Sequence, residues 1–264
     1  MNSLVPADPW KFLGRWTPAR IGLGRTGGSL PASEALEFRL DHARARDAVH
    51  HTFAFNALAE KLENSFGLPV LRLKSQAENR TIYLQRPDLG RRLDPESVSI
   101  LQTQKPPQKP FDLVILITDG LSSIAVEQGV IPLLEVLLPR LQSAGFHLAP
   151  LCLIQQGRVA VQDEVGQNLG ARIALSLIGE RPGLKAPDSL AAYFVHDPKV
   201  GRSDADRNCI SNIRPAGLHP EEASDKLLYL LNRARELGFS GVQLKDEMPG
   251  ALPGSQSGPG LIDS

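Results

Sequence analysis

The chain has 264 residues, enough for one large domain or two modest ones, and its 42% hydrophobic and 22% charged content is ordinary for a soluble globular protein. Basic and acidic residues number 29 each, so no net charge favours binding to nucleic acid or to an anionic membrane. The two cysteines are too few for a disulfide framework, no apolar run approaches the ~18 residues of a membrane span, and the N-terminus lacks a secretory pattern, which together predict a soluble cytoplasmic protein.

Residues 1–32 are rich in proline and glycine, and Gly22, Gly24 and Gly27 spell the G-x-G-x-x-G pattern of a dinucleotide site. That site needs a buried strand before the pattern and a helix that opens through its last glycines. Only a short stretch of strand character precedes Gly22, and Pro31 cuts off a helix that would start at Gly27. We therefore expect an extended arm that lies on a neighbouring chain. An NAD-dependent oxidoreductase is the less favoured alternative.

A helical pattern of apolar residues runs from Ser33 to a stop at Gly67. His42, Arg46 and His50 recur every four residues and so share one face of this helix. A metal site would need another ligand aimed at the same point. The favoured interpretation is a polar helix face that meets a partner or nearby aspartates.

The segment that follows is predicted to contain short strands and then a linker. Apolar and β-branched residues predict strands at 70–73 and 81–84. Residues 87–110 contain several prolines and a polar tract, which indicates a linker with a domain boundary near 108. Residues 33–108 are therefore interpreted as a helical N-terminal region and linker, and residues 109–247 as the main domain.

Residues 113–117 form a continuous run of branched apolar residues, which predicts a strand buried on both faces of a sheet. A polar turn and a helical pattern follow, as in the first half of a parallel α/β unit. Ligands of such sheets lie outside the carboxyl ends of the strands, here near Asp119 to Ser123. The simpler alternative is an ordinary turn in which Asp119 or Ser122 caps the helix.

The remainder of the main domain alternates strands and helices. Pro132 and Pro139 predict a break in the first helix near Val130 and a second helix that begins around Pro132. The further predicted elements are strands at 148–155, 173–178, 193–195 and 242–244 and helices at 161–169 and 220–237. This order indicates an α/β fold with a mostly parallel sheet and helices on both faces. Residues 248–264 are predicted to be a flexible tail.

Parallel strands share the edge at which they end, so the loops after them are expected to meet. The loops concerned are Asp119–Ser123, Gln156–Val159 and Gly179–Gly183, and a polar loop over Gly201–Pro215 follows them. Together they predict a broad polar shelf. Its glycines admit a bulky ligand, and Arg181 and Arg214 are candidates to bind phosphate or carboxamide oxygens.

The sequence contains no nucleophile elbow, P-loop or His-Glu-x-x-His motif. Glu180, at the predicted edge of the sheet, is a ligand candidate. Cys209 has no histidine near it in sequence, so we expect its thiol to pack or to touch a ligand rather than to act as a nucleophile. No catalytic residue and no metal ligand is predicted on this chain.

Seven stretches, in order between Thr17 and Glu247, resemble one known family. They are TPARIGLGRTGGSLP, LDHARARDAVH, DLVILITDGLSS, QQGRVAVQDEVG, LIGERPGL, DRNCISNIRPAGL and GVQLKDE. The family is the small (light) subunit of adenosylcobalamin-dependent ethanolamine ammonia-lyase. The resemblance is interrupted mainly at residues 66–108.

The resemblance implies a complex that converts ethanolamine to acetaldehyde and ammonia by radical chemistry. It further implies a large subunit, a TIM barrel, that binds ethanolamine and supplies the catalytic residues. The small subunit would have a Rossmann-like domain that covers part of the cobalamin. By motif, the family's cobalamin contacts carry over to Val159, Glu180 and Cys209.

Two departures from related patterns add to this expectation. The Asp-x-His-x-x-Gly motif of many cobalamin-binding domains is absent, which agrees with a base-on cofactor whose dimethylbenzimidazole stays on cobalt. Only about ten residues precede Trp10, which puts targeting to a bacterial microcompartment in doubt, so a free cytoplasmic enzyme and a packaged one both stay open. Besides the dinucleotide alternative, a non-catalytic scaffold subunit remains a competing hypothesis.

Overall fold

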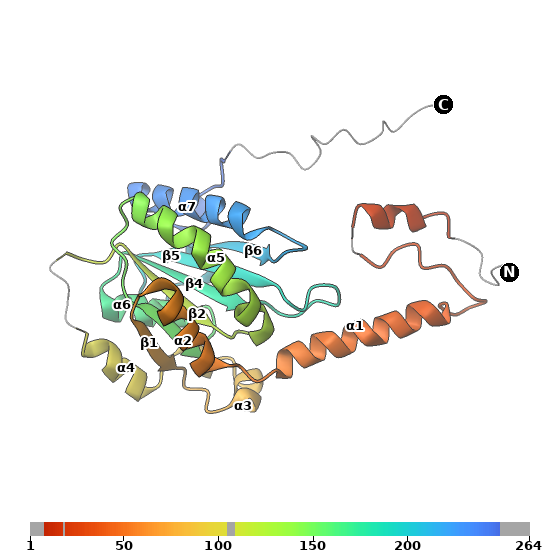
Figure 1. The fold of residues 1–264 in the computed structure, drawn as a ribbon, viewed down its shortest axis with the longest axis horizontal. Helices are drawn as coiled ribbons and strands as arrows, with labels where there is room; N and C mark the ends of the chain where they lie inside the picture. The colour runs from red at the N-terminus through yellow and green to blue at the C-terminus, as the bar shows by residue number, and fades with distance from the viewer. Residues whose placement is uncertain (1–7, 18, 105–108, 249–264) are drawn as a thin grey trace.

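The centre of the fold is a six-stranded sheet with the strand order β1-β3-β2-β4-β5-β6 (Figure 1). The computed structural model describes residues 8–17, 19–104 and 109–248. The strands are β1 Val70–Lys74, β2 Leu113–Thr118, β3 Leu151–Gln155, β4 Ile173–Gly179, β5 Leu190–His196 and β6 Arg207–Ile213. The first four strands in the sheet are parallel to one another, and β5 and β6 are added antiparallel. The predicted α/β class and mostly parallel sheet are confirmed, with an antiparallel part that the sequence did not indicate.

Helices cover both faces of the sheet, as predicted. Leu113, Ile115 and Ile117 of β2 face a core formed with α2 (Phe55–Phe66), α5 (Ser123–Ser143) and α7 (Pro220–Leu237). The alternate residues Val114 and Leu116 face a second core formed with α4 (Pro95–Gln102) and α6 (Val161–Leu169). Every residue of β2 is buried, which explains why its sequence is a continuous apolar run.

The expected break near Val130 does not occur, because α5 is one continuous helix that contains both Pro132 and Pro139. The two prolines are seven residues apart, so they lie on the same face of the helix, and both are exposed. The carbonyls that lose their partners belong to Gln128 and Glu135, which are also exposed and can be hydrated. The buried leucines on the opposite face hold the helix together.

Several short segments form another type of secondary structure than the one predicted for them. The single helical stretch over 33–66 is two helices, α1 (Ala32–His50) and α2, and the strand predicted at 81–84 is the helix α3 (Arg80–Gln85). The strand predicted at 242–244 is a 3-10 turn (Gly241–Gln243). The loop predicted over 201–215 contains β6, and the linker over 87–110 contains α4. Tertiary pairing overrides weak local preference in these short segments.

The strand predicted at 70–73 forms as β1 and pairs with β3. The sheet therefore takes in residues on both sides of the predicted boundary near 108. Residues 105–108 themselves, and the predicted tail from 249 onward, lie outside the described residues. Among the residues described, no helix is both long and apolar enough to cross a membrane.

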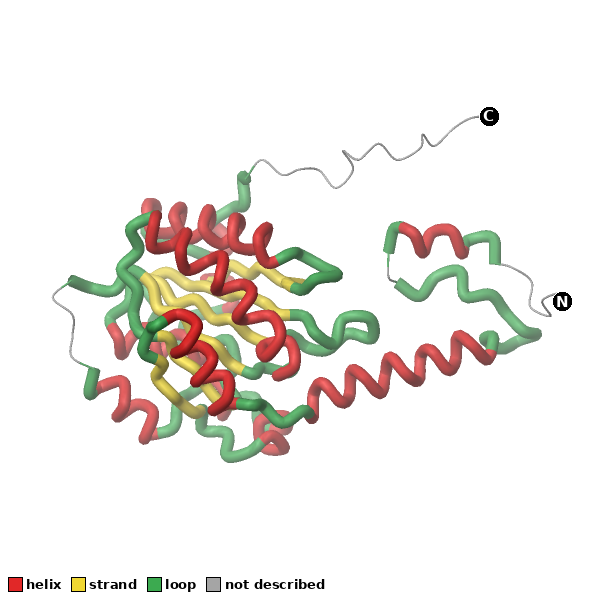
Figure 2. The backbone as a smooth tube through the Cα atoms, viewed as in Figure 1, coloured by secondary structure: helices red, strands yellow, loops and turns green. Residues whose placement is uncertain are grey.

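The helix α1 projects from the body of the molecule, and the described part of the arm folds back beside it (Figures 1 and 2). Within the arm, Gly22 has φ +62° and lies so close to Lys11 that an added Cβ would come within 2.5 Å of the Lys11 nitrogen. No strand precedes Gly22 in the described residues, and α1 begins only at Ala32. The glycines thus turn the arm back on itself, and the strand–turn–helix unit of a dinucleotide site is not formed.

The turn between β2 and α5 packs directly on the end of β4, and this yields a stability prediction. Gly120 has φ +56°, and an added Cβ would lie 2.2 Å from the Gly179 carbonyl oxygen. Gly145 has φ +74° but open space around it. We expect Gly120→Ala to lower the free energy of unfolding by about 3 kcal/mol or more, against about 1 kcal/mol for Gly145→Ala. Urea unfolding of both variants measures this, and equal losses would contradict the close packing of the turn.

Candidate functional site

Two adjoining hollows lie at the carboxyl ends of β2, β3 and β4 and extend over Tyr193 of β5 and Cys209 of β6. Their volumes are about 320 Å³ and about 430 Å³, and both are lined by Arg158, Val159 and Tyr193. The first is also lined by Tyr83, Leu121, Ile178, Gly179, Glu180 and Arg181, and the second by Pro87, Arg91, Ala160, Arg202, Ser203, Asp204, Arg207 and Cys209. We call this continuous surface the shelf.

The shelf brings together the three residues singled out from the sequence. Val159 lines both hollows, Glu180 lines the first and Cys209 lines the second. Arg181 also borders the first hollow. Arg214 does not reach the shelf, because it is buried with its Nε 2.8 Å from Asn212 Oδ1 and its Nη1 3.5 Å from an Asp188 oxygen.

The loop that presents Val159 is held through its backbone. Gln156, which has φ +59°, donates its N–H to Asp119 Oδ1 at 2.7 Å. The Gly157 N–H donates to Thr118 Oγ1 at 2.9 Å, and the Gly157 carbonyl accepts from the Tyr83 hydroxyl at 3.2 Å. Because neighbouring groups of the loop are each bonded to the sheet end or to α3, the position of Val159 is fixed before any ligand binds.

Asp119 is structural rather than ligand-binding. It is 2% exposed, and its Oδ2 accepts from Arg80 Nη1 at 3.3 Å. Burial raises the pKa of the Asp119 carboxyl to about 6, and the Arg80 guanidinium opposes that rise. Ser122 caps α5, as in the simpler interpretation of this turn, because its hydroxyl accepts from the Ala125 N–H at 3.3 Å.

Glu180 is anchored at the start of the hairpin between β4 and β5. Its Oε2 accepts from the Asn212 N–H at 2.9 Å and also receives the Ser189 hydroxyl. In the described part of the chain, no hydrogen bond reaches the other oxygen, Oε1. One carboxylate oxygen is therefore fixed, and the second is free to accept from a ligand.

Tyr193 of β5 lies directly opposite Cys209 of β6 and Ser176 of β4 in the sheet register. Desolvation raises the pKa of the Cys209 thiol; the neighbouring Tyr193 hydroxyl opposes the rise, and the Glu180 carboxylate adds to it. Burial likewise raises the pKa of Tyr193, and the neighbouring Cys209 thiol adds to the rise. The thiol therefore stays protonated at neutral pH, which suits contact with a ligand and not nucleophilic attack.

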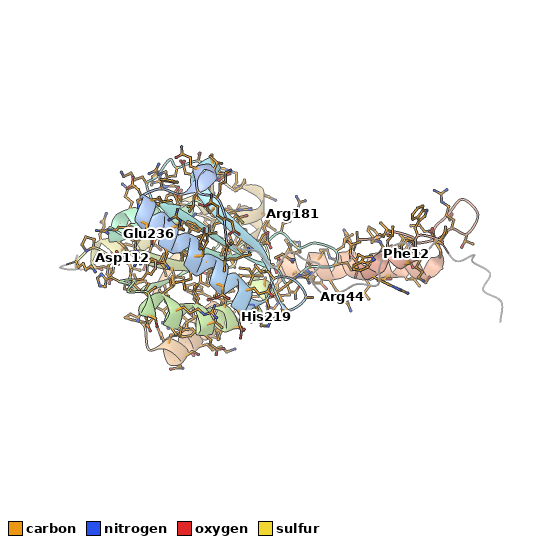
Figure 3. The ribbon with its side chains drawn as sticks, turned by 90° about the horizontal axis from the view of Figure 1, so that it is seen from above. Phe12, Arg44, Asp112, Arg181, His219 and Glu236 are labelled. Atoms are coloured by element: carbon orange, nitrogen blue, oxygen red, sulfur yellow. The ribbon has the colours of Figure 1, made fainter. Side chains whose placement is uncertain are left out.

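Positive charge dominates the rim of the shelf. Arg202 and Arg207 are neutralised by Asp197 and Asp163, respectively. Within the described residues, no carboxylate forms a salt bridge with Arg91, Arg158 or Arg181; Figure 3 shows Arg181 near the point where α1 leaves the body. The Arg158 guanidinium lies 4.2 Å from the centre of the Tyr83 ring, and its buried Nε has no hydrogen-bond partner among these residues. The arginines of the rim can therefore donate hydrogen bonds to anionic or amide oxygens of a ligand.

The described residues contain no group of three or more histidine, cysteine or acidic side chains able to hold a metal ion. The face of α1 that carries His42, Arg46 and His50 is exposed. What the shelf offers is an apolar floor, a cationic rim and one free carboxylate oxygen. That combination suits binding of a broad ligand with polar edges and supplies no evident nucleophile–base pair.

The family model described as "Ethanolamine ammonia-lyase light chain (EutC)" matches residues 7–245. The chain belongs to this family. An ethanolamine ammonia-lyase small subunit of Azotobacter vinelandii is 53% identical over 264 residues, covering 98% of this chain and 97% of that protein. Proteins with the same name from Pseudomonas putida W619 and Pseudomonas syringae pv. tomato are 52% and 48% identical, covering 92% and 93% of this chain and 89% and 86% of their own lengths.

Membership of the ethanolamine ammonia-lyase light-chain family does not account for every residue of the shelf. Tyr83, Arg91 and Tyr193 line it, and none was singled out from the sequence. Tyr83 and Arg91 lie in segments predicted as strand and linker, so nothing in their spacing pointed to the sheet edge. Arg158 had a signal, because it directly precedes Val159 in the Gln-Gly-Arg-Val loop.

The raised pKa of Asp119 predicts a pH dependence of stability. The unfolded carboxyl titrates near 3.9 and the folded one near 6, so between these values the folded protein holds a proton that the unfolded chain has released. This contribution is present below about pH 4 and is lost as the pH rises through 6. The free energy of unfolding of the wild type, minus that of Asp119→Asn, should therefore fall by up to about 3 kcal/mol over this range.

Urea unfolding of the two proteins at several pH values measures this difference. The other buried carboxyl with a raised pKa, Asp163, is present in both proteins, so its effect cancels in the comparison. Parallel stability curves between pH 4 and 7 would contradict the account of Asp119.

Proposed function

We propose that this chain is the small subunit of an adenosylcobalamin-dependent ethanolamine ammonia-lyase and that it covers part of the cobalamin at the interface with a large subunit. The observation that carries the proposal is the shelf, which places Val159, Glu180 and Cys209 around one continuous surface. These are the positions at which the resemblance to the family implies cobalamin contacts. The family membership supports the reaction, which converts ethanolamine to acetaldehyde and ammonia.

The residues of the shelf fit such a cofactor. A corrin is a broad, flat ring whose edge carries amide groups. Val159, Ile178 and Tyr193 supply a mostly apolar floor. The free Oε1 of Glu180 suits an amide N–H, and the unpartnered Nε of Arg158 suits an amide or phosphate oxygen.

Each residue has a distinct part in this proposal. Val159 packs against the cofactor from a loop whose backbone is already fixed, so little conformational entropy is lost on binding. Glu180 orients the cofactor through an amide, while Asn212 and Ser189 hold the carboxylate in place. Cys209 contributes a neutral thiol contact. The cofactor supplies the radical chemistry when bound, and this chain supplies binding, orientation and exclusion of water.

The partner in this proposal is a TIM-barrel large subunit that binds ethanolamine and carries the catalytic residues. The proposal includes a base-on cofactor, a Rossmann-like domain whose sheet takes in β1 as well as residues 109–247, and a hetero-oligomer in the cytoplasm. Packaging in a bacterial microcompartment is the alternative location. The names of the similar proteins, which are small subunits, support a larger partner.

The site assignment predicts the effect of substitutions on cofactor affinity. In the complex with the large subunit, Glu180→Ala and Val159→Asp should each weaken adenosylcobalamin binding by about tenfold or more. Glu180→Ala removes a hydrogen-bond acceptor, and Val159→Asp replaces an apolar contact with a carboxylate that must lose its water. Cys209→Ser should be milder. Glu135→Ala, on the exposed face of α5, is the matched control and should bind like the wild type. A spectroscopic titration of the corrin measures these affinities, and wild-type affinity in both site variants would refute the assignment.

Because the proposal places the catalytic residues on the large subunit, the purified small subunit alone should have no turnover, even with adenosylcobalamin and ethanolamine present. The shelf is open on one side and offers no evident cluster of donors for a small amino alcohol, so it forms only one wall of a closed site. Adding the large subunit should restore acetaldehyde production, saturating at a fixed ratio of chains. Turnover by the small subunit alone would refute the two-subunit proposal, and saturation without any corrin spectral change would favour a scaffold role.

A further inference from the structure

Four of the five basic residues of α1 gather on one face, and the fifth, Arg44, is exposed on the opposite side. Arg39, His42, Arg46 and His50 are spaced by three or four residues and fall within about 80° of one another around the helix axis. We call these four residues the basic stripe. All four are exposed, and the one salt bridge that joins the stripe to a carboxylate in the described residues is the exposed pair of Arg46 and Asp47, at 3.8 Å. Such a pair neutralises little of the charge.

Glu34, Glu37 and Asp41 lie on the side of α1 away from the stripe, and other parts of this protein contact them there. Lys185 of the β4–β5 hairpin bridges Glu37 and Asp41, with 2.8 Å between its Nζ and an Asp41 oxygen. Arg20 of the arm lies 3.8 Å from both Glu34 and Asp41. The internal contacts of α1 therefore use its acidic side and leave the basic stripe open.

Apolar side chains flank the stripe. Leu36 and Leu40 are one turn apart, next to Arg39, and are 64% and 50% exposed. Two large aliphatic side chains at helical spacing beside a row of basic side chains form the pattern of a contact surface, with an apolar centre and a polar margin.

The stripe continues toward the shelf. A hollow of about 490 Å³ lies between α1 and residues 181–184 of the β4–β5 hairpin, and His42, Arg46, His50 and Arg181 line it without any carboxylate. Arg181 also borders the first hollow of the shelf. One partner surface can therefore contact the stripe and reach the edge of the shelf at the same time.

We propose that this open side of α1 docks on an acidic surface of the large subunit, with Leu36 and Leu40 packed on an apolar strip and the basic stripe and Arg181 paired with carboxylates. The inference rests on the proposed function, because it assigns the surface through which the proposed partner is held. The net charge of the whole chain is zero, so the attraction comes from the local group of Arg39, Arg46 and Arg181. The contact is therefore sensitive to ionic strength.

The test is the affinity of the small subunit for the large subunit of the same organism, measured by calorimetric titration without cobalamin at low and high salt. The double variant Arg39→Glu/Arg46→Glu should bind about tenfold or more weakly than the wild type at low salt and should show a shallower salt dependence. Leu40→Ser should weaken binding with an unchanged salt dependence. The matched control is Lys61→Glu, an exposed cation of α2 without a carboxylate partner in the described residues, which should bind like the wild type.

Circular dichroism and thermal unfolding check that the variants fold. If the charge-reversal variant does not fold, the milder double variant Arg39→Gln/Arg46→Gln gives the same test. Wild-type affinity in a folded double variant would overturn the docking assignment and leave the proposed function standing. Loss of self-association or of RNA binding in that variant, with unchanged affinity for the large subunit, would also overturn it. Failure of the wild type to bind the large subunit at any salt concentration would overturn the proposed function together with this surface.

Discussion

The ion pair between Arg80 and buried Asp119 connects the parts of this protein on which the shelf depends. From α3, Arg80 donates to the Val49 carbonyl near the end of α1 at 2.8 Å and to the Gly120 carbonyl at 2.7 Å. Asp119 in turn accepts from the Gln156 N–H and so sets the loop that presents Val159. Burying a carboxylate is costly without such partners, and the raised pKa of Asp119 shows that the partners offset this cost only in part.

This arrangement makes the shelf a product of the fold and not of a few ligand residues. The end of β2, the loop after β3 and the start of the β4–β5 hairpin are held by backbone hydrogen bonds and by the close approach of Gly120 to Gly179. The antiparallel strands β5 and β6 then extend the surface sideways and bring Tyr193 and Cys209 beside Glu180. Arg80 of the same ion pair also donates to the Val49 carbonyl and so connects the end of α1 to the turn beneath the shelf.

The sequence predicted the strongly patterned elements and missed the weakly patterned ones, for physical reasons. The buried strands β2 and β4 and the amphipathic helix α7 have continuous or periodic apolar residues, and they form where expected. β6 has exposed and polar residues such as Asn208 and Ser211, so only its pairing with β5 makes it a strand. Val159, Glu180 and Cys209 were identified through loop position and resemblance, whereas Tyr83 and Tyr193 reach the shelf through tertiary contacts that no local pattern records.

Hydrogen exchange of the assembled complex, with and without adenosylcobalamin, tests the central claim most directly, because it reports on the backbone of this chain independently of turnover. The account predicts that the cofactor slows exchange in three separate segments, those that contain Val159, Glu180 and Cys209, while segments of α7 on the opposite face of the sheet exchange as before. Binding of the cofactor to the complex with unchanged exchange in all three segments would contradict the claim that this shelf covers the cobalamin.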